Sequence, residues 1–555
     1  MKSLRLSIIG LTAFIISVPG YIAMGQNRGL KTITEDELRY HLEFLGSEEF
    51  RGRETPSPEL EIATLYLGNW SKAAGLKPFL SDGSFYQTIP ITVGSVSEAN
   101  TRLRVTNGGI ENTFYYAESF GGSFSQTGSC NGDVVFVGLG LVYPEKEWDD
   151  LKDIDMYGKI VMIMDAQHPD NSFDLGFTYS YRLSSRIREI RNRGAAGVLV
   201  IIDPEREGKR KSGQKIFADI PSGRMAVLYD SQLRGAPRSQ SQGAAGNRPT
   251  RPYAPFMQAD ISHSVASSIL GIPENEVADM FYTSGKGVQV QGQVLPNTMI
   301  NLNVEVSTEP STTRNVLGLI EGTDPELKNE FIVICAHHDH LGISDGEIIA
   351  GADDNGSGTV GLMEIAQALV ADPPKRSVII AWFTGEERGF IGSQYFINNL
   401  GIPVEMIDAC LNMDMISRNN IDSLYLVGSN LLSSELDAAI HNANKASGIN
   451  FGFDYLYSNL THPQSVYFRS DQYPHIRFGI PSVWFFSGFT HDYHTPADIT
   501  ANVDYQKMLK VTRLVYLAAF KIGNMKGMLK LDVNPEVISR GAHNLPTRSL
   551  FENTR

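Results

Sequence analysis

Clusters of imidazole and carboxylate side chains recur in the C-terminal half of the chain, and they have the composition of a metal site. In chain order they are His337 and Asp339, Asp353 and Asp354, Glu386 and Glu387, Asp414, and His494. Imidazole nitrogen and carboxylate oxygen are the ligands that zinc takes where no thiolate is available. Two divalent metals about 3.5–4 Å apart need a shared ligand, and an aspartate can be one because each of its oxygens can bind one metal.

Two adjacent glutamates, Glu386 and Glu387, could divide the chemistry of such a centre. One carboxylate would bind metal, and the other would take a proton from a metal-activated water and pass it to a leaving amine. Taken alone, each cluster has an ordinary explanation, because Asp353 and Asp354 could cap a helix and His494 could belong to a turn. Their joint appearance, each after a predicted strand, favours a hydrolytic metal site.

Apolar strands alternate with helices in this half of the chain. The predicted strands cover residues 331–336, 378–383, 406–413 and 483–486, and a predicted helix covers residues 359–370. This alternation is typical of an α/β fold with a mainly parallel sheet and helices on both faces. In such sheets ligands bind beyond the carboxyl ends of the strands, which is where the polar clusters fall.

The rest of the chain divides by its local patterns. Helix start signals at Thr34 and Ser57 indicate a packed N-terminal part, whereas a later segment alternates short β-rich runs with turns. We predict a signal peptide (1–25), the first part of a catalytic domain (26–114), an inserted β-rich domain (115–300), the rest of the catalytic domain (301–530) and a C-terminal tail (531–555).

The first residues indicate export. Lys2 and Arg5 precede an apolar run, Leu6 to Val18, and small residues follow at Ala23 and Gly25. This is the pattern of a cleaved signal peptide, and the apolar run is shorter than the roughly 20 residues of a spanning helix. We therefore expect a periplasmic or extracellular protein without stable membrane insertion. The formal net charge of -14 argues against nucleic acid as a partner. The oligomeric state is left open.

Five motifs together resemble the M28 family of zinc peptidases over residues of about 314–520. They are Ala-His-His-Asp-His-Leu-Gly (336–342), Gly-Ala-Asp-Asp-Asn-Gly-Ser-Gly (351–358), Gly-Glu-Glu-Arg-Gly-Phe-Ile-Gly-Ser (385–393), Asn-Met-Asp (412–414) and Tyr-His-Thr-Pro (493–496). Two runs of the inserted segment, Tyr-Gly-Lys-Ile-Val (157–161) and Gly-Ala-Ala-Gly-Val (194–198), resemble a protease-associated (PA) domain.

The resemblance implies a role for each residue of the site. The implied ligands of two zinc ions are His337, Asp354, Glu387, Asp414 and His494, with Asp354 as the bridge. The implied catalytic residues are Glu386 as general base, Asp339 behind His337, and Tyr467 as a hydrogen-bond donor to the developing oxyanion. Asp498 would support His494, and the histidines left outside the ligand set are His338, His340, His475 and His491.

These roles together predict an exported dinuclear zinc aminopeptidase that hydrolyses N-terminal residues from peptides with a free N-terminus. Three alternatives remain open. A carboxypeptidase on the same scaffold would need a basic pocket for the terminal carboxylate of its substrate. A glutaminyl cyclase would act with one zinc ion. A receptor-like binding protein would keep the fold without catalysis, although here the ligand set and the base are complete.

Overall fold

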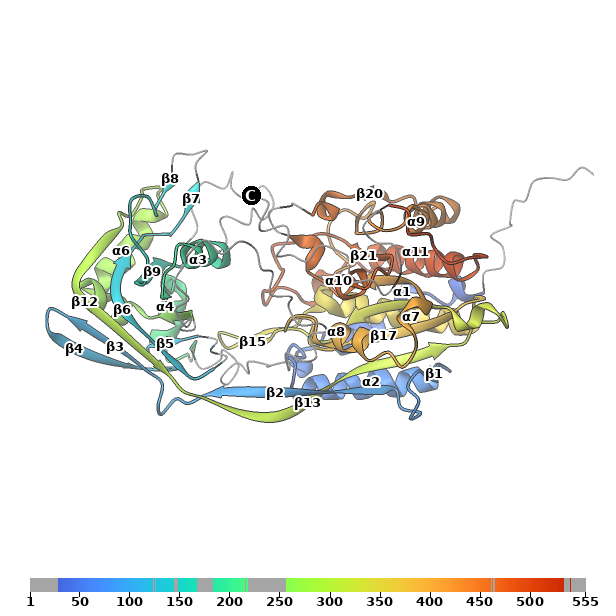
Figure 1. Ribbon diagram of the computed structural model, residues 1–555, viewed down its shortest axis with the longest axis horizontal. Coiled ribbons are helices and arrows are strands. Elements are labelled where there is room, and N and C mark those ends of the chain that lie inside the picture. The colour runs from blue at the N-terminus through green and yellow to red at the C-terminus, as the bar shows by residue number, and fades with distance from the viewer. Residues whose placement is uncertain are drawn as a thin grey trace, which may run out of the picture.

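The computed structural model describes residues 28–122, 124, 126–143, 148–166, 183–214, 216–217, 256–460, 462, 465–533 and 540. The predicted signal peptide and nearly all of the predicted tail lie outside this part of the chain. Figure 1 shows two bodies joined by two long neighbouring strands. Within the described residues, no helix combines the length and the apolar character that crossing a membrane requires.

The larger body is built on a nine-stranded sheet with the order β1-β13-β17-β14-β18-β21-β19-β20, and β2 pairs with β13. Its strands are β1 (Lys77–Pro78), β2 (Tyr86–Val96), β13 (Val306–Ile320), β14 (Phe331–His337), β17 (Ser377–Phe383), β18 (Ile407–Met413), β19 (Ser423–Val427), β20 (Gly452–Asp454) and β21 (Ser482–Phe486). The four central strands β17, β14, β18 and β21 are parallel, and antiparallel pairs flank them. The predicted α/β class with a mainly parallel central sheet is confirmed.

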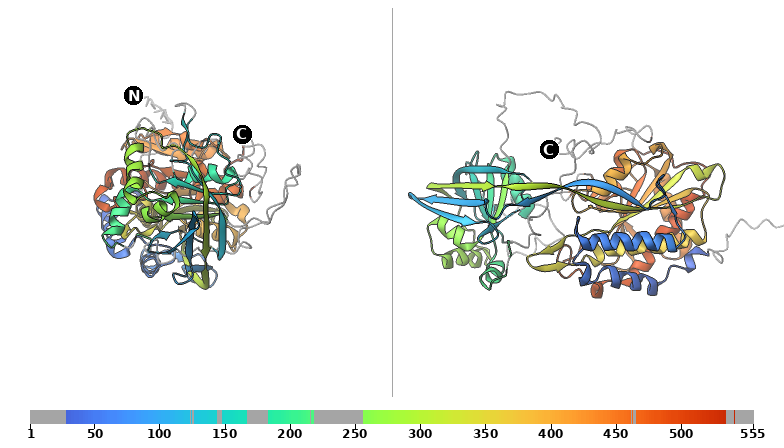
Figure 2. Two further views of the ribbon diagram at one scale, coloured as in Figure 1. Left: turned by 90° about the vertical axis from the view of Figure 1, so that its left-hand side faces the viewer. Right: turned by 90° about the horizontal axis from the view of Figure 1, so that it is seen from below.

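Helices cover both faces of this sheet, as Figures 1 and 2 show. They are α1 (Glu35–Leu45), α2 (Pro58–Ala73), α7 (Gly358–Ala371), α8 (Ile391–Asn398), α9 (Ser434–Ser447), α10 (Gln472–Arg477) and α11 (Tyr505–Gly523). Alternate residues of β14 point to opposite faces. Ile332 and Ile334 pack with α1, α7, α9 and α11, whereas Val333 and Cys335 pack with α8. Burial on both faces explains why the central strands are almost continuously apolar.

The predicted starts of the first two helices coincide with side-chain caps. The hydroxyl of Thr34 accepts a hydrogen bond from the backbone N–H of Glu37 at 3.3 Å, at the start of α1. The hydroxyl of Ser57 accepts one from the backbone N–H of Leu60 at 3.0 Å, and Pro58 follows at the first position of α2. Each cap satisfies a backbone donor that lacks a partner within its own helix.

The smaller body contains an eight-stranded sheet with the order β4-β3-β12-β6-β9-β10-β11-β5. Its elements are β3 (Arg102–Asn107), β4 (Ile110–Tyr115), β5 (Phe120–Gly121), β6 (Gly128–Phe136), β9 (Ile160–Met164), β10 (Gly197–Ile201), β11 (Met257–Ile261), β12 (Gln293–Val304), α3 (Leu183–Asn192), α4 (Pro204–Lys211), α5 (His263–Leu270) and α6 (Glu274–Ser284), with a separate pair of short strands, β7 (Val142–Tyr143) and β8 (Trp148–Asp149). This sheet begins at Arg102, earlier than the predicted boundary at residue 115. The reason is that β3 and β4 form a hairpin whose first strand pairs with β12.

The two bodies meet at a hairpin beside the predicted site. The hairpin is β15 (Gly342–Ser344) and β16 (Glu347–Ile349), and its turn contains Asp345. Arg206 of α4 forms an ion pair with Asp345 at 2.9 Å, and the side chain of Gln214 donates to the backbone oxygen of Asp345 at 2.8 Å. Because the hairpin lies between β14 and the Asp354 turn, the smaller body touches the segment that joins two predicted ligands.

A buried carboxyl group between α1 and α7 makes stability depend on pH. Burial, together with the nearby charge of Glu37, raises the pKa of Glu364 to about 8. Between pH 4.5 and about 8 the unfolded chain releases this proton and the folded protein keeps it, so stability falls as the pH rises. We expect Glu364→Gln to raise the free energy of unfolding by about 4 kcal/mol more at pH 8.5 than at pH 4. Urea unfolding midpoints at the two pH values check this, and an equal effect at both would contradict it.

Candidate metal centre

The predicted ligands converge at the carboxyl ends of the central strands. His337 is the last residue of β14, Glu387 follows β17, Asp414 follows β18, and His494 lies in the loop after β21. Asp354 lies in the kinked turn (Ala352–Ser357) that precedes α7. Since the four strands are parallel neighbours, their carboxyl ends meet at one edge of the sheet.

Within the described residues, two groups of candidate ligand atoms share Asp354: His337 and Asp414 belong to one, and His340 and Glu387 to the other. Nε2 of His337 lies 3.4 Å from Oδ1 of Asp354 and 3.4 Å from Oδ1 of Asp414. On the other side, Nε2 of His494 lies 3.1 Å from Oδ2 of Asp354 and 3.4 Å from Oε1 of Glu387. Asp354 therefore directs one oxygen toward each group, which is the geometry a bridging carboxylate needs.

In the described part of the chain, two ligand atoms of the first group are buried without a hydrogen-bond partner, as expected where a cation binds. Nε2 of His337 and Oδ1 of Asp414 are both buried, and within the described residues neither has a hydrogen-bond partner. An imidazole nitrogen and a carboxylate oxygen left in this state are costly unless a cation binds between them. The donors are nitrogen and oxygen without thiolate, a set that suits zinc.

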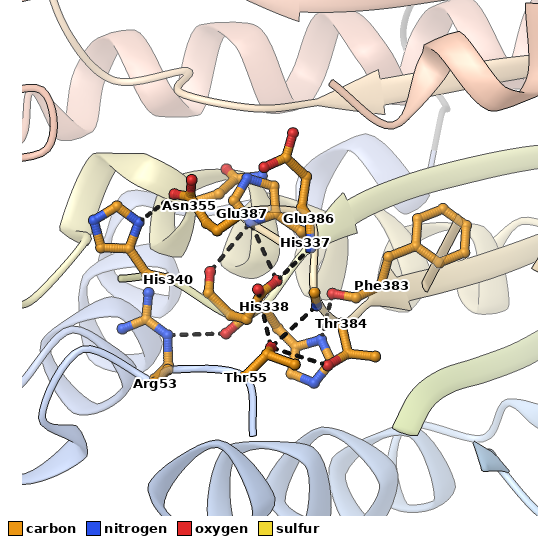
Figure 3. A network of polar contacts seen from close by, with 12 residues as sticks. Arg53, Thr55, His337, His338, His340, Asn355, Phe383, Thr384, Glu386 and Glu387 are labelled. Carbon is orange, nitrogen blue, oxygen red and sulfur yellow. Dashed lines mark hydrogen bonds and ion pairs between the residues drawn. The ribbon is translucent and has the colours of Figure 1, made fainter. Parts of the chain in front are cut away.

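A polar network holds the first ligand and the glutamate pair in place (Figure 3). Nδ1 of His337 lies 3.1 Å from the backbone oxygen of Asp339 and 3.7 Å from its carboxylate. That carboxylate accepts hydrogen bonds from the hydroxyl of Thr55 at 3.0 Å and from the backbone N–H of Glu386 at 3.2 Å. Asp339 thus links the strand end that carries His337 to the strand end that carries the glutamates.

Asp498 acts on a different ligand from the one we expected. Its carboxylate accepts hydrogen bonds from the backbone N–H groups of Asp353 and Asp354, at 2.8 and 3.0 Å. It therefore fixes the turn of the shared carboxylate. The guanidinium of Arg53 adds to this by donating to the backbone oxygens of Ala350 and Gly351, both at 2.9 Å.

The two glutamates differ in their surroundings. Burial tends to raise the pKa of Glu387, but the charge of His494 and a hydrogen bond with His340 hold this pKa well below its usual value. Burial raises the pKa of Glu386 well above its usual value. Among the described residues, no hydrogen bond or ion pair engages the carboxylate of Glu386, which lines the pocket beside the ligands. Figure 3 shows this side chain extending away from the network.

Tyr467 is not among the residues that line the pocket beside the ligands. Its side chain is buried in an apolar cluster with Val466, Phe468 and Trp484. Arg469 and Tyr493 are among the residues that line the pocket with the ligands although the sequence analysis gave them no role. An arginine and a tyrosine inside such motifs carry no signal of their own, because their contact forms only when two separate loops fold together.

His340 lies at the site, although the sequence analysis left it outside the ligand set. Its Nδ1 is 2.8 Å from Oε1 of Glu387 and 3.9 Å from Oδ2 of Asp354. The His-x-Asp-His spacing after a strand was the available signal, because it places two imidazoles at one strand end. A hydrogen bond of this kind orients a ligating carboxylate.

Replacing His340 is expected to weaken the second group selectively. His340→Asn removes the imidazole that contacts Glu387, so we expect the metal on that side to bind about 10–100-fold more weakly. The metal beside His337 should be less affected. Stepwise chelator titration with metal analysis checks this, and His338→Asn is the neighbouring control. Equal weakening on both sides would contradict a local role.

Residues 315–519, which contain all of these ligand candidates, match the sequence pattern of peptidase family M28. The leucine aminopeptidase 2 of Trichophyton rubrum is 25% identical over 312 residues, which cover 50% of this chain and 60% of that protein. An aminopeptidase of Pseudomonas aeruginosa (strain UCBPP-PA14) is 27% identical over 214 residues, or 38% of each chain. The chain thus spans about 60% of the length of the first of these relatives.

Two solved structures resemble the chain over most of its length. An aminopeptidase from Aneurinibacillus sp. strain AM-1 has a TM-score of 0.51 and 16% identity, and covers 92% of this chain and 98% of its own. A zinc aminopeptidase from Bacillus subtilis has a TM-score of 0.52 and 15% identity, and covers 92% of this chain and 99% of its own. At these identities the likeness is one of fold. The sequence similarity to peptidase family M28 covers residues 315–519, the part of the chain that holds the ligand candidates.

Proposed function

We propose that this protein is a zinc aminopeptidase with two metal ions per chain, acting on peptides with a free N-terminus. The observation that carries the proposal is the position of Asp354, which directs one carboxylate oxygen toward each of two ligand groups. The names of the relatives support the aminopeptidase activity. The name of the Bacillus subtilis structure supports zinc.

The residues would hold the metals in two sets joined by one bridge. His337 and Asp414 would hold one ion, Glu387 and His494 would hold the other, and Asp354 would bind both. Zinc ions in such a centre polarise a carbonyl group and lower the pKa of water. Tetrahedral coordination leaves room for water beside the protein ligands.

Glu386 would carry the proton. Its carboxylate lines the pocket. Among the described residues, this carboxylate has no hydrogen-bond or ion-pair partner. It would take a proton from the attacking water and then give that proton to the nitrogen of the leaving amine, so that one group serves as base and acid in turn. The raised pKa of Glu386 brings the carboxylate closer to neutral pH, where a group can both accept and return a proton.

The mature chain can be tested by counting bound metal while assaying aminoacyl substrates with free and blocked N-termini. We expect two zinc ions per chain and cleavage of the free-amine substrates alone. One zinc ion with cyclisation of N-terminal glutamine would replace the proposal with a glutaminyl cyclase. Cleavage of blocked peptides from the carboxyl end would replace it with a carboxypeptidase. Bound metal without turnover of any substrate would favour a receptor-like protein.

We also infer that the protein is exported to the periplasm or the extracellular space, because residues 1–25 have the pattern of a signal peptide. We propose that the smaller body is a PA-type domain, because two runs of its sequence, residues 157–161 and 194–198, resemble such a domain. Determining the N-terminal sequence of the protein recovered outside the cytoplasm tests the export proposal. A cell-associated chain that still begins at Met1 would contradict it.

A further inference from the structure

Arg469 lies in the pocket beside the proposed metal centre. It follows a short 3-10 helix (Val466–Phe468) and lines the pocket together with the ligands. Its Nη2 donates a hydrogen bond to the hydroxyl of Tyr493 at 2.9 Å, and its Cζ lies 5.0 Å from the centre of the Phe489 ring. A guanidinium held by a hydroxyl and an aromatic ring is fixed in orientation before any ligand arrives.

The guanidinium of Arg469 has no anionic partner among the described residues. Three other arginines of this body form ion pairs: Arg376 with Glu330, Arg388 with Glu54, and Arg418 with Asp492. Arg418 can be compared with Arg469, because the two arginines contact neighbouring residues of one loop. Arg418 pairs with the carboxylate of Asp492, whereas Arg469 contacts the uncharged hydroxyl of Tyr493. A guanidinium has five N–H donors, and the bond to Tyr493 uses one. The side chain is half-buried, so its remaining donors can reach a ligand in the pocket.

The charges of the pocket favour an anion at this position. The carboxylates that line the pocket are those of Asp354, Glu386, Glu387 and Asp414. Two divalent metals would balance these four negative charges, and the guanidinium then adds a positive charge without a counter-charge. A substrate that brings a carboxylate would supply it, and a guanidinium fork can bind a carboxylate through two parallel hydrogen bonds.

We propose that Arg469 is a specificity-determining residue that binds a carboxylate of the substrate. The proposal rests on the aminopeptidase function proposed above. The carboxylate can come from the side chain of an aspartate or glutamate residue next to the cleaved bond, or from the C-terminus of a dipeptide. Both sources offer the same planar anion to the same donors. Tyr493 and Phe489 act as positioning residues that hold the guanidinium at the pocket wall.

Substrate pairs that differ only in charge test this. The pairs are aspartyl against asparaginyl anilide, for the side chain, and Leu-Gly against Leu-Gly amide, for the C-terminus. We expect Arg469→Gln to lower the ratio of kcat/KM for the charged over the neutral member of one pair by roughly 10- to 100-fold, the effect of a charge-assisted hydrogen bond. Arg469→Lys should keep part of the ratio. Arg477→Gln, a nearby arginine that does not line the pocket, is the matched control.

A binding measurement tests carboxylate recognition by Arg469 without requiring that the protein cleave a peptide. Calorimetry on the zinc-loaded protein compares aspartate with asparagine, and D-Leu-Gly with its amide. We expect the wild type to bind the charged member of one pair at least about tenfold more tightly, and Arg469→Gln to abolish that difference. The pair that responds identifies the source of the carboxylate. If neither pair shows a difference, or if Arg469→Gln leaves both ratios unchanged, the inference is overturned. Absent turnover alone would overturn the aminopeptidase proposal instead.

Discussion

Replacing Glu386 by glutamine is expected to lower kcat by about 10²–10⁴-fold while both metals stay bound. Glutamine has nearly the same shape, but its amide cannot accept a proton from water or return one to an amine. The carboxylate of Glu386 has no hydrogen-bond or ion-pair partner among the described residues, so its loss should leave the surrounding contacts intact. Steady-state kinetics on a free-amine substrate, together with zinc analysis of the same preparation, measure both parts of this prediction.

Two variants make the result interpretable. Glu387→Gln removes a proposed ligand, so it should lose activity together with metal. Glu405→Gln changes an exposed carboxylate of the same body and should change neither quantity. Near-normal turnover by Glu386→Gln with full zinc content would show that another group moves the proton. Loss of zinc from Glu386→Gln would instead make this residue a ligand.

The ligand candidates could be predicted because the signal for each of them is local. His337 ends a strand whose apolar run is visible in the sequence, Asp414 directly follows such a strand, and Glu387 lies four residues after the end of another. Parallel strands then bring these positions to one edge of the sheet without further information. The shared position of Asp354 needed the resemblance, because a glycine-rich turn alone does not indicate which carboxylate faces two groups.

Contacts between distant loops could not be predicted in the same way. The bond between Arg469 and Tyr493 joins residues 24 positions apart, and neither residue type points to it. The partners of Asp498 were also missed, because a carboxylate near a ligand can bond either to that ligand or to the backbone of another turn. The domain boundary before Arg102 depends on the pairing of β3 with β12, which are about two hundred residues apart.

Replacing Asp354 by asparagine is expected to have the other large effect, which is the loss of both metals. One oxygen of Asp354 faces His337 and the other faces His494, so one substitution alters both groups. Asparagine keeps a single neutral carbonyl oxygen, and its NH₂ group cannot serve as a ligand. We expect fewer than one zinc ion per chain at equilibrium with a weak chelator, and a loss of kcat/KM on the order of 10³-fold.

Asp414→Asn separates a bridging role from an ordinary ligand role. Asp414 belongs to the His337 group alone, so its replacement should release one metal and leave the other bound. Metal analysis of the two variants side by side therefore gives different counts if Asp354 is shared. If Asp354→Asn retains one zinc ion in the same way as Asp414→Asn does, the two groups do not depend on a common carboxylate. The two-metal arrangement proposed here would then be wrong, because its geometry rests on that single side chain.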